Sequence, residues 1–276
     1  MAIAAPVAPV FDVTALTVEY RDDARTVHAV TDLTFSVRRG ETLALIGESG
    51  SGKTTAALAV LGMLPRNAVV VSGNAVVTAG GGAVDLLDLR PDALRSMRWR
   101  RVAYVPQGSI SALNPVQRVR THFIQTARAH GMGRDAAESR ANELLPAVHL
   151  DPERILRAYP HELSGGTRQR VAIALSMLLE PAVIVLDEPT TALDVLTQEA
   201  VLTTLRELQR ATSVSYVLIT HDLGVAAAMA DDIVVMHDGK AVEHGNAEQI
   251  LTAPQHTYTR SLLAAMPRLD AGEAGA

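Results

Sequence analysis

Residues 47–54 carry the clearest chemical signal in the sequence. They read Gly-Glu-Ser-Gly-Ser-Gly-Lys-Thr and fit the pattern G-x-x-x-x-G-K-[ST]. Glycines allow backbone N–H groups to wrap closely around phosphate, in conformations that a side chain would obstruct. Lys53 can then reach the β- and γ-phosphates of a nucleotide, and the Thr54 hydroxyl can ligate magnesium. An expected strand precedes the loop and an expected helix follows it. This context favours phosphate binding over a glycine-rich turn that binds nothing.

Two carboxylates follow a short apolar run at 182–186. We expect this run to be a buried strand that ends in Asp187 and Glu188. If it lies next to the strand that leads into the phosphate loop, it carries Asp187 to the magnesium site. Glu188 then lies near the γ-phosphate, where it can orient and deprotonate an attacking water. The alternative is two acids that end a strand and start a turn at Pro189, and the phosphate loop makes that alternative the weaker one.

A second anion-binding element is expected at residues 164–166. Ser164, Gly165 and Gly166 precede a helical run, so they combine a hydroxyl, free N–H groups and the positive end of a helix dipole. A plain helix N-cap would have the same sequence. A chain with two phosphate-binding helix starts either binds two anions itself or contributes one of the two sites to a ligand bound by a partner.

The composition narrows the function classes. The chain has 276 residues, a net charge of −5, no cysteine and 3% aromatic residues. Disulfides, thiolate metal sites and a cysteine nucleophile are therefore excluded. An acidic chain with few aromatics is also a poor nucleic-acid binder. No apolar stretch reaches the roughly 20 residues of a membrane span, and the first residues make a poor signal peptide. We therefore expect an intracellular, soluble chain that meets a membrane only through a partner.

The elements that must position these residues change along the chain. The first hundred residues alternate in polarity and predict strands at 11–20, 33–37 and 42–46, with a hairpin across 68–82. Helices are expected at 55–63, 134–148 and 167–179. After residue 182, strands at 182–186, 214–219 and 233–236 alternate with helices at 197–209 and 223–229, which is typical of a covered parallel sheet. The expected fold is an α/β core with an antiparallel β flank and a helical insertion.

At this level of detail the chain resembles the ATP-binding subunit of an ABC transporter, in the peptide, nickel and opine uptake branch. The resemblance covers roughly residues 13–267. Residues 47–54 match the Walker A motif, 183–188 the Walker B motif and 163–167 the signature motif. Gln107 matches the Q-loop, Asp194 the D-loop and His221 the switch histidine. Residues 111–115 and 254–263 resemble segments specific to this branch.

The resemblance implies a role for each matched residue. Tyr20 would stack on adenine, although an ordinary strand-end tyrosine remains the alternative. Glu188, His221 and Gln107 would be catalytic, and Thr54, Gln107 and Asp187 would arrange Mg²⁺, partly through water. Ser164, Gly165 and Gly166 would contact ATP bound to the opposite subunit of a head-to-tail dimer. The implied ATP-binding residues are Tyr20, Gly47, Glu48, Ser49, Gly50, Ser51, Gly52, Lys53, Thr54 and Thr55.

The implied fold is a P-loop NTPase of the ABC type with an antiparallel β subdomain and an inserted α-helical subdomain. We expect one domain over 11–267, with the insertion at about 108–178, between flexible tails at 1–10 and 268–276. The implied partners are a second ABC ATPase, identical or different, two membrane permeases and, indirectly, an extracytoplasmic substrate-binding protein, with no nucleic acid. The chain would act at the cytoplasmic face of the cell membrane and power import.

Two features qualify the resemblance. The signature ends in Thr167, where the superfamily most often has glutamine. The printed sequence also ends soon after Pro267 and lacks cysteine, as in shorter members that serve nickel or metal-chelate uptake, so peptides, nickel and metal chelates all remain possible cargoes.

A soluble ABC-type ATPase of DNA repair, translation or cluster assembly is the main alternative. The arginines at 95, 98, 100 and 101 are expected to form a solvated helix face.

Overall fold

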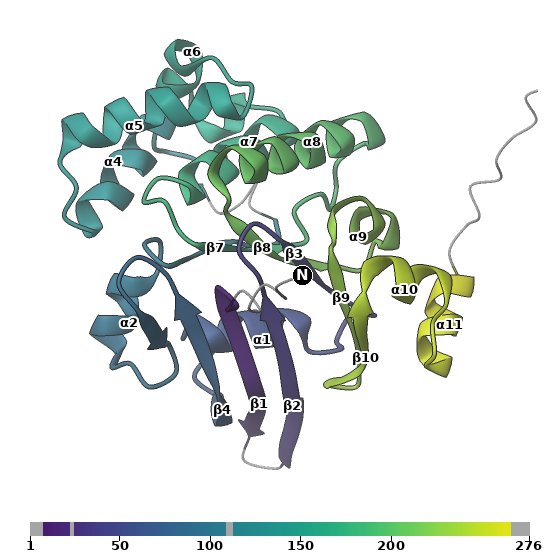
Figure 1. Cartoon of the computed structure of the whole chain (residues 1–276). Coiled ribbons are helices and arrows are strands. Elements are labelled where there is room, and N and C mark those ends of the chain that lie inside the picture. The colour runs from purple at the N-terminus through teal and green to yellow at the C-terminus, as the bar shows by residue number, and fades with distance from the viewer. Residues whose placement is uncertain (1–7, 23–24, 109–112, 266–276) are drawn as a thin grey trace, which may run out of the picture.

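The computed structural model describes residues 8–22, 25–108 and 113–265. Its centre is a six-stranded sheet with the strand order β10-β9-β3-β8-β7-β6 (Figure 1). Strands β9, β3, β8, β7 and β6 run parallel, and β10 pairs antiparallel with β9 at one edge. The strands of this sheet are β3 (Thr42–Ile46), β6 (Val102–Val105), β7 (Val183–Asp187), β8 (Ser215–Thr220), β9 (Asp232–His237) and β10 (Lys240–Asn246).

A second sheet is antiparallel and has the order β2-β1-β4-β5. The pairing of its two longest strands, β1 and β2, shifts register at several positions. The expected hairpin across residues 68–82 is present as the β4–β5 pair. The strands of this sheet are β1 (Phe11–Asp22), β2 (Arg25–Val37), β4 (Ala68–Thr78) and β5 (Ala83–Asp85).

The helices divide between the two faces of the six-stranded sheet. Figure 1 shows α4, α5 and α6 on the side away from β1, β2 and β4, with α7 and α8 between them and the sheet. A short 3₁₀ helix at Pro160–Glu162 precedes α7. The helices are α1 (Lys53–Val60), α2 (Pro91–Met97), α4 (Val119–Ala129), α5 (Arg134–Ala147), α6 (Pro152–Arg157), α7 (Gly165–Ser176), α8 (Val195–Thr212), α9 (Leu223–Met229), α10 (Ala247–Thr252) and α11 (Thr257–Ala264).

The core has two parts because side chains alternate across the parallel strands. Ile184, Leu186 and Leu218 belong to a buried cluster shared with helices α4 to α9. Val185 and Val217, one residue along, belong to a cluster shared with α1 and the antiparallel sheet. Central strands buried on both faces read as continuous apolar runs, which is why the sequence located them well.

The predicted α/β fold with an antiparallel flank and a helical insertion is confirmed, and the differences are local. Strands β6 and β10 were not predicted, since β6 has only four residues and β10 is a polar edge strand. Helix α1 begins two residues earlier than expected, directly after Gly52. Val10, assigned to the flexible N-terminal tail, is buried, and its N–H donates to Val37 O at 2.8 Å. The rest of that tail before residue 8, and the C-terminal tail at 268–276, lie outside the described residues.

Across residues 8–22, 25–108 and 113–265, none of the helices combines the length and the apolar character that crossing a bilayer requires.

Candidate functional site

The phosphate loop joins the end of β3 to the start of α1 and holds its own lysine. The Lys53 side chain is buried, and its Nζ donates to Gly47 O at 2.8 Å, Glu48 O at 2.7 Å and Ser51 Oγ at 3.0 Å. Burial lowers the pKa of Lys53, and the nearby carboxylates of Glu188, Asp187 and Glu48 oppose that shift. A buried ammonium in this position can transfer a hydrogen bond to a phosphate oxygen.

Two glycines of the loop have no room for a side chain. A Cβ on Gly47 would lie 2.2 Å from Met236 O, and one on Gly52 would lie 2.4 Å from Ala29 O. Both have positive φ, +148° and +100°, which other residues rarely adopt. The loop is therefore packed against β2 and the end of β9 on one side, which leaves its other side available to a ligand.

Asp187 ends β7 and contacts the first turn of α1. Thr54 Oγ1 donates to Asp187 Oδ1 at 3.1 Å, and Tyr104 OH donates to Asp187 Oδ2 at 2.9 Å. Asp187 is fully buried. Burial raises the pKa of Asp187, and the hydrogen bonds from Tyr104 and Thr54 oppose that effect.

The two motif strands are not adjacent, so the condition set for Asp187 to reach the phosphate loop is not met directly. Strand β8 lies between β3 and β7, and it pairs with both in parallel. Asp187 still meets Thr54 because α1 begins at the carboxyl edge of the sheet, where all of these strand ends gather.

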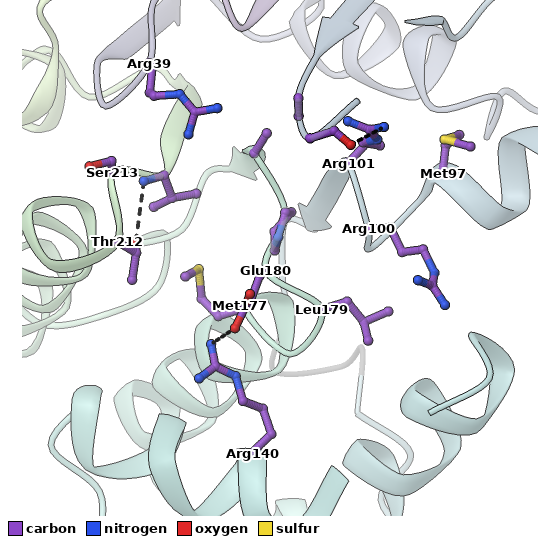
Figure 2. Close-up of a pocket in the computed structure, with 15 residues that line it drawn as sticks. Arg39, Met97, Arg100, Arg101, Arg140, Met177, Leu179, Glu180, Thr212 and Ser213 are labelled. Carbon is purple, nitrogen blue, oxygen red and sulfur yellow. Dashed lines mark hydrogen bonds and ion pairs between the residues drawn. The ribbon is translucent and has the colours of Figure 1, made fainter. Parts of the chain in front are cut away.

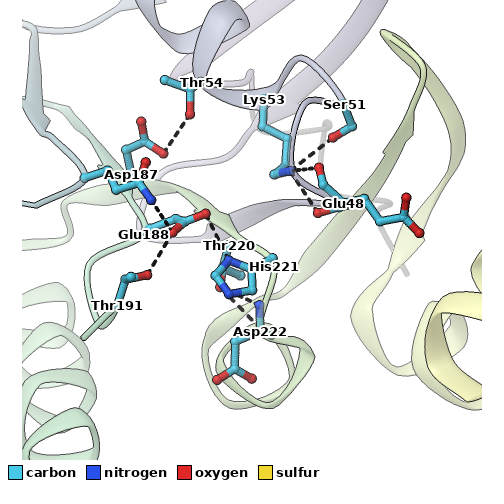
Figure 3. A network of polar contacts seen from close by, with 12 residues as sticks. Glu48, Ser51, Lys53, Thr54, Asp187, Glu188, Thr191, Thr220, His221 and Asp222 are labelled. Atoms are coloured by element: carbon cyan, nitrogen blue, oxygen red, sulfur yellow. Dashed lines mark hydrogen bonds and ion pairs between the residues drawn. The ribbon is translucent and has the colours of Figure 1, made fainter. Parts of the chain in front are cut away.

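Glu188 is the centre of a polar network at the same edge (Figure 3). Its Oε2 accepts from Gln107 Nε2 at 2.7 Å and from Thr191 Oγ1 at 2.8 Å. Its Oε1 lies 2.9 Å from His221 Nδ1. Partial burial would raise the pKa of Glu188, but hydrogen bonds from His221 and Thr191 outweigh it, so the pKa is lowered. The carboxylate is therefore ionised at neutral pH.

The backbone of Glu188 is held in an unusual conformation. Its φ is +47°, in the left-handed region that non-glycine residues seldom occupy. Its N–H donates to Ile219 O on β8 at 2.8 Å. This turn directs the side chain away from the strand toward His221, which follows β8 directly. Such strained positions are concentrated at functional sites.

A cavity of about 270 Å³ opens between the loop and this network. Asp187 is not among its lining residues, because it lies buried beneath the site. Tyr20, at the end of β1, is among the lining residues, so it lies on the same cavity as the predicted base. The lining residues are Tyr20, Ala29, Ser49, Gly50, Gly52, Lys53, Thr54, Thr55, Gln107 and Glu188.

Ser164 and Asp194 start helices elsewhere. Ser164 caps α7 by accepting from Thr167 N at 3.3 Å, and its Oγ lies 2.8 Å from Thr167 Oγ1. Asp194 caps α8 by accepting from the N–H and the hydroxyl of Thr197. A Cβ on Gly166 would lie 2.2 Å from Thr197 Cγ2, so the two helix starts pack tightly. Among the described residues that line the cavity, none comes from α7 or α8.

Sequence reasoning gave no role to Tyr104 and Thr191. Tyr104 lies on β6, three residues before Gln107. Its hydroxyl reaches Asp187 because β6 pairs with β7. Thr191 lies three residues after Glu188 in a tight turn, where a hydroxyl can reach back to its start. That short spacing was the one available signal for Thr191.

A larger cavity, of about 730 Å³, lies at the opposite edge of the sheet (Figure 2). It is lined by residues that precede β3, β6, β7 and β8, among them Arg39, Arg101 and Glu180. The predicted solvated helix face of four arginines holds only for Arg95, which is exposed on α2. Helix α2 ends at Met97, so the other three arginines lie beyond it and donate to backbone carbonyls. Arg98 donates to Leu61 O and Gly62 O, Arg100 to His130 O, and Arg101 to Gly80 O. The candidate catalytic groups lie at the other edge.

A glycine loop with its lysine at one strand end, and two carboxylates two strands away, is the arrangement of a P-loop nucleotide-binding ATPase. The ABC transporter family matches residues 30–191, and the C-terminal region of oligopeptide/dipeptide transporters matches residues 242–275. The chain belongs to the ABC transporter family.

Individual relatives agree with this assignment. The dipeptide transport ATP-binding protein DppD of Caldanaerobacter subterraneus is 40% identical over 89% of this chain and 75% of its own length. The glutathione import ATP-binding protein GsiA of Escherichia coli K12 is 41% identical over 93% of this chain, which spans only 42% of that relative. The ATP-binding cassette MJ0796, solved as a dimer with ADP and Pi, has a TM-score of 0.74 and 26% identity, covering 86% of this chain and 98% of that one.

Proposed function

We propose that this chain binds ATP with Mg²⁺ and hydrolyses it in a head-to-tail dimer to drive uptake of a small peptide. The observation that carries the proposal is the Glu188 carboxylate, held at once by Gln107 and His221 beside the phosphate loop. Its pKa is lowered, so the group is ionised at neutral pH and can accept a proton from water as that water attacks the γ-phosphate. Hydrolysis then yields ADP and phosphate.

The other residues of the site position the phosphates and stabilise their charge. Lys53 and the loop amides neutralise phosphate oxygens, and His221 holds the γ-phosphate end while it contacts the base. Tyr20 faces the same cavity and supplies a ring for adenine. In phosphoryl transfer, positioning and electrostatic stabilisation provide most of the acceleration.

The residues around Thr54 suit Mg²⁺. The Thr54 hydroxyl, the buried Asp187 carboxylate and the Gln107 side chain present hard oxygen atoms at the carboxyl edge of the sheet. When bound there, Mg²⁺ supplies positive charge to the β- and γ-phosphate oxygens. Tyr104 and Thr54 hold the Asp187 carboxylate in place for that role.

The second half of each site comes from a partner in this proposal. Ser164, Gly165 and Gly166 would close over ATP bound to the opposite subunit, and Asp194 would lie at the dimer interface. Two observations support this arrangement. None of the described residues lining the cavity comes from α7 or α8, and Val195 and Leu196, next to Asp194, are 80% and 78% exposed. Large apolar side chains with such high exposure are typical of a surface that a partner covers.

The proposed cargo follows from the relatives. The two sequence relatives are named for dipeptide transport and glutathione import, and the C-terminal match is to oligopeptide/dipeptide transporters. None of these names mentions nickel or a metal chelate. We therefore propose peptide cargo, two membrane permeases, a substrate-binding protein outside the membrane and a position at the cytoplasmic face.

Glu188→Gln tests the proposed base. The amide keeps the size of the side chain but cannot accept a proton, so we expect ATP binding to persist while steady-state hydrolysis falls by about a hundredfold or more. Glu207→Gln, on the exposed face of α8, is the matched control and should hydrolyse ATP normally. Unchanged hydrolysis in Glu188→Gln would show that Glu188 is not the base.

A pull-down distinguishes the transport function from the alternative, a soluble ATPase with no role in transport. The tagged chain is recovered from detergent-solubilised host membranes, and its partners are identified by mass spectrometry. Two multi-spanning proteins and a second ATPase support transport. Only soluble partners, with the chain absent from membranes, would leave the ATPase chemistry and refute transport.

A further inference from the structure

Helix α11 contacts the phosphate loop, although the two segments lie 210 residues apart in the sequence. Tyr258 lies in the first turn of α11, and its hydroxyl accepts a hydrogen bond from the backbone N–H of Glu48 at 3.3 Å. Figure 1 places α10 and α11 beside the β9–β10 edge of the main sheet. The region that contains Tyr258 is the one that matches oligopeptide/dipeptide transporters separately from the ATPase family itself.

The bonded N–H belongs to the peptide group whose carbonyl accepts a hydrogen bond from Lys53. Glu48 N and Gly47 O are the two polar ends of one peptide group. Gly47 O accepts from Lys53 Nζ at 2.8 Å while Glu48 N donates to Tyr258. A trans peptide group is planar, with its N–H and C=O pointing in opposite directions. Fixing the direction of the N–H therefore fixes the direction of the carbonyl that anchors Lys53.

This peptide group needs an external support because of the residue before it. Gly47 has no Cβ and a φ of +148°, so its backbone has more accessible conformations than any other residue would allow. An ammonium has three N–H donors. Two N–H groups of the Lys53 ammonium donate to Gly47 O and Glu48 O, and the third donates to Ser51 Oγ. The two carbonyls therefore direct the third N–H, which is the one that a phosphate oxygen can take.

Tyr258 is itself held firmly. Its ring stacks on His237 with centroids 3.9 Å apart and planes at 26°. His256 caps α11 by accepting from Tyr258 N at 3.2 Å. The Glu243 carboxylate on β10 accepts from Gln255 N and His256 N, which anchors the turn before the helix. The β9–β10 turn beneath the ring also supports the loop, since Gly239 N donates to Ser51 O at 3.2 Å.

We propose that Tyr258 is a positioning residue of the nucleotide site, which orients the Gly47–Glu48 peptide group and through it Lys53. The proposal rests on the proposed function, because it assigns the C-terminal region a part in ATP binding by this same loop. It also explains why a tyrosine, with both a ring to stack and a hydroxyl to bond, stands at this position.

Tyr258→Phe isolates the hydroxyl, since the ring and its stack on His237 remain. We measure the dissociation constant of a fluorescent ATP analogue, kcat and KM for ATP, and the melting temperature of the nucleotide-free chain. Loss of one neutral hydrogen bond should raise the dissociation constant and KM about three- to tenfold, with a smaller change in kcat. The melting temperature should stay close to that of the wild type, because the bond is at the surface of the loop.

Tyr216→Phe is the matched control. It removes a buried hydroxyl that donates to Leu205 O at 3.0 Å, so it should lower the melting temperature and leave ATP affinity unchanged. Wild-type affinity in Tyr258→Phe, whether or not its melting temperature falls, would overturn the proposal. So would an equal loss of affinity in Tyr216→Phe, because general destabilisation would then explain both. A wild-type chain that binds no ATP analogue refutes the proposed function itself, and this is seen before any variant is compared.

Discussion

Thr191 offers a direct test of how the structure tunes the proposed base. Its hydroxyl donates to Glu188 Oε2 at 2.8 Å, and this bond is one of those that lower the pKa of Glu188. Thr191→Val keeps the shape of the side chain and removes the donor. Because the lost bond stabilises the charged form, the pKa of Glu188 must rise. The acid limb of the pH–rate profile should therefore move to higher pH.

The size of the shift follows from the contacts that remain. A hydrogen bond to a charged group contributes about 1.5–3 kcal/mol, and one pKa unit corresponds to about 1.36 kcal/mol. Gln107 and His221 still bond to the carboxylate, and the Glu188 side chain is 15% exposed, so water can replace part of the lost bond. We expect a shift of about half a unit to one unit.

The assay is kcat/KM for ATP hydrolysis from about pH 3.5 to pH 8, because this parameter reports groups of the free enzyme and the range must reach below the ordinary pKa of a carboxyl group. Thr191→Ser retains the hydroxyl and should restore the wild-type profile. Thr252→Val, which removes a hydroxyl bonded within α10, is the distant control. A Thr191→Val profile that keeps its acid limb, or moves it to lower pH, would refute the reasoning even if the overall rate falls.

Two further predictions concern the packing of two helix starts and the buried Asp187 carboxylate. Gly166→Ala places a Cβ 2.2 Å from Thr197 Cγ2 and should abolish ATP-dependent dimerisation in a Glu188→Gln background, measured by size-exclusion chromatography. Adding Thr197→Ser removes that methyl, keeps the hydroxyl that bonds Asp194 and should restore the dimer; no rescue would place the fault elsewhere. Tyr104→Phe leaves the buried Asp187 Oδ2 without its 2.9 Å hydrogen bond. It should cost about 1–3 kcal/mol, or roughly 2–10 °C in melting temperature, and an unchanged melting temperature would contradict this.

The sequence predicted the central strands well because their composition is dictated by burial. Strands β3, β7 and β8 are buried at every position, so their apolar runs are continuous and end where the motifs begin. Local patterns also located the phosphate loop, since its glycines and lysine are adjacent in the chain. Strand β10 was not predicted because polar and apolar residues alternate only weakly along this edge strand, and β6 was not predicted because it is short.

Contacts between distant segments could not be predicted in the same way. Tyr258 and Glu48 are 210 residues apart, and neither residue type indicates a contact with the other. The same holds for Tyr104 and Asp187, which meet only because β6 pairs with β7 in one particular register. Strand order was also hidden, because apolar runs identify strands without saying which two are neighbours.

The insertion of β8 between β3 and β7 has a consequence for the site. In the observed order, Glu188 donates its N–H to Ile219 O, and His221 comes two residues later at the neighbouring strand end. Its ring then reaches the carboxylate at 2.9 Å. The strand that ends at His221 therefore lies between the strand that leads into the lysine loop and the strand that ends at the Glu188 turn, and all three groups meet at one edge of the sheet.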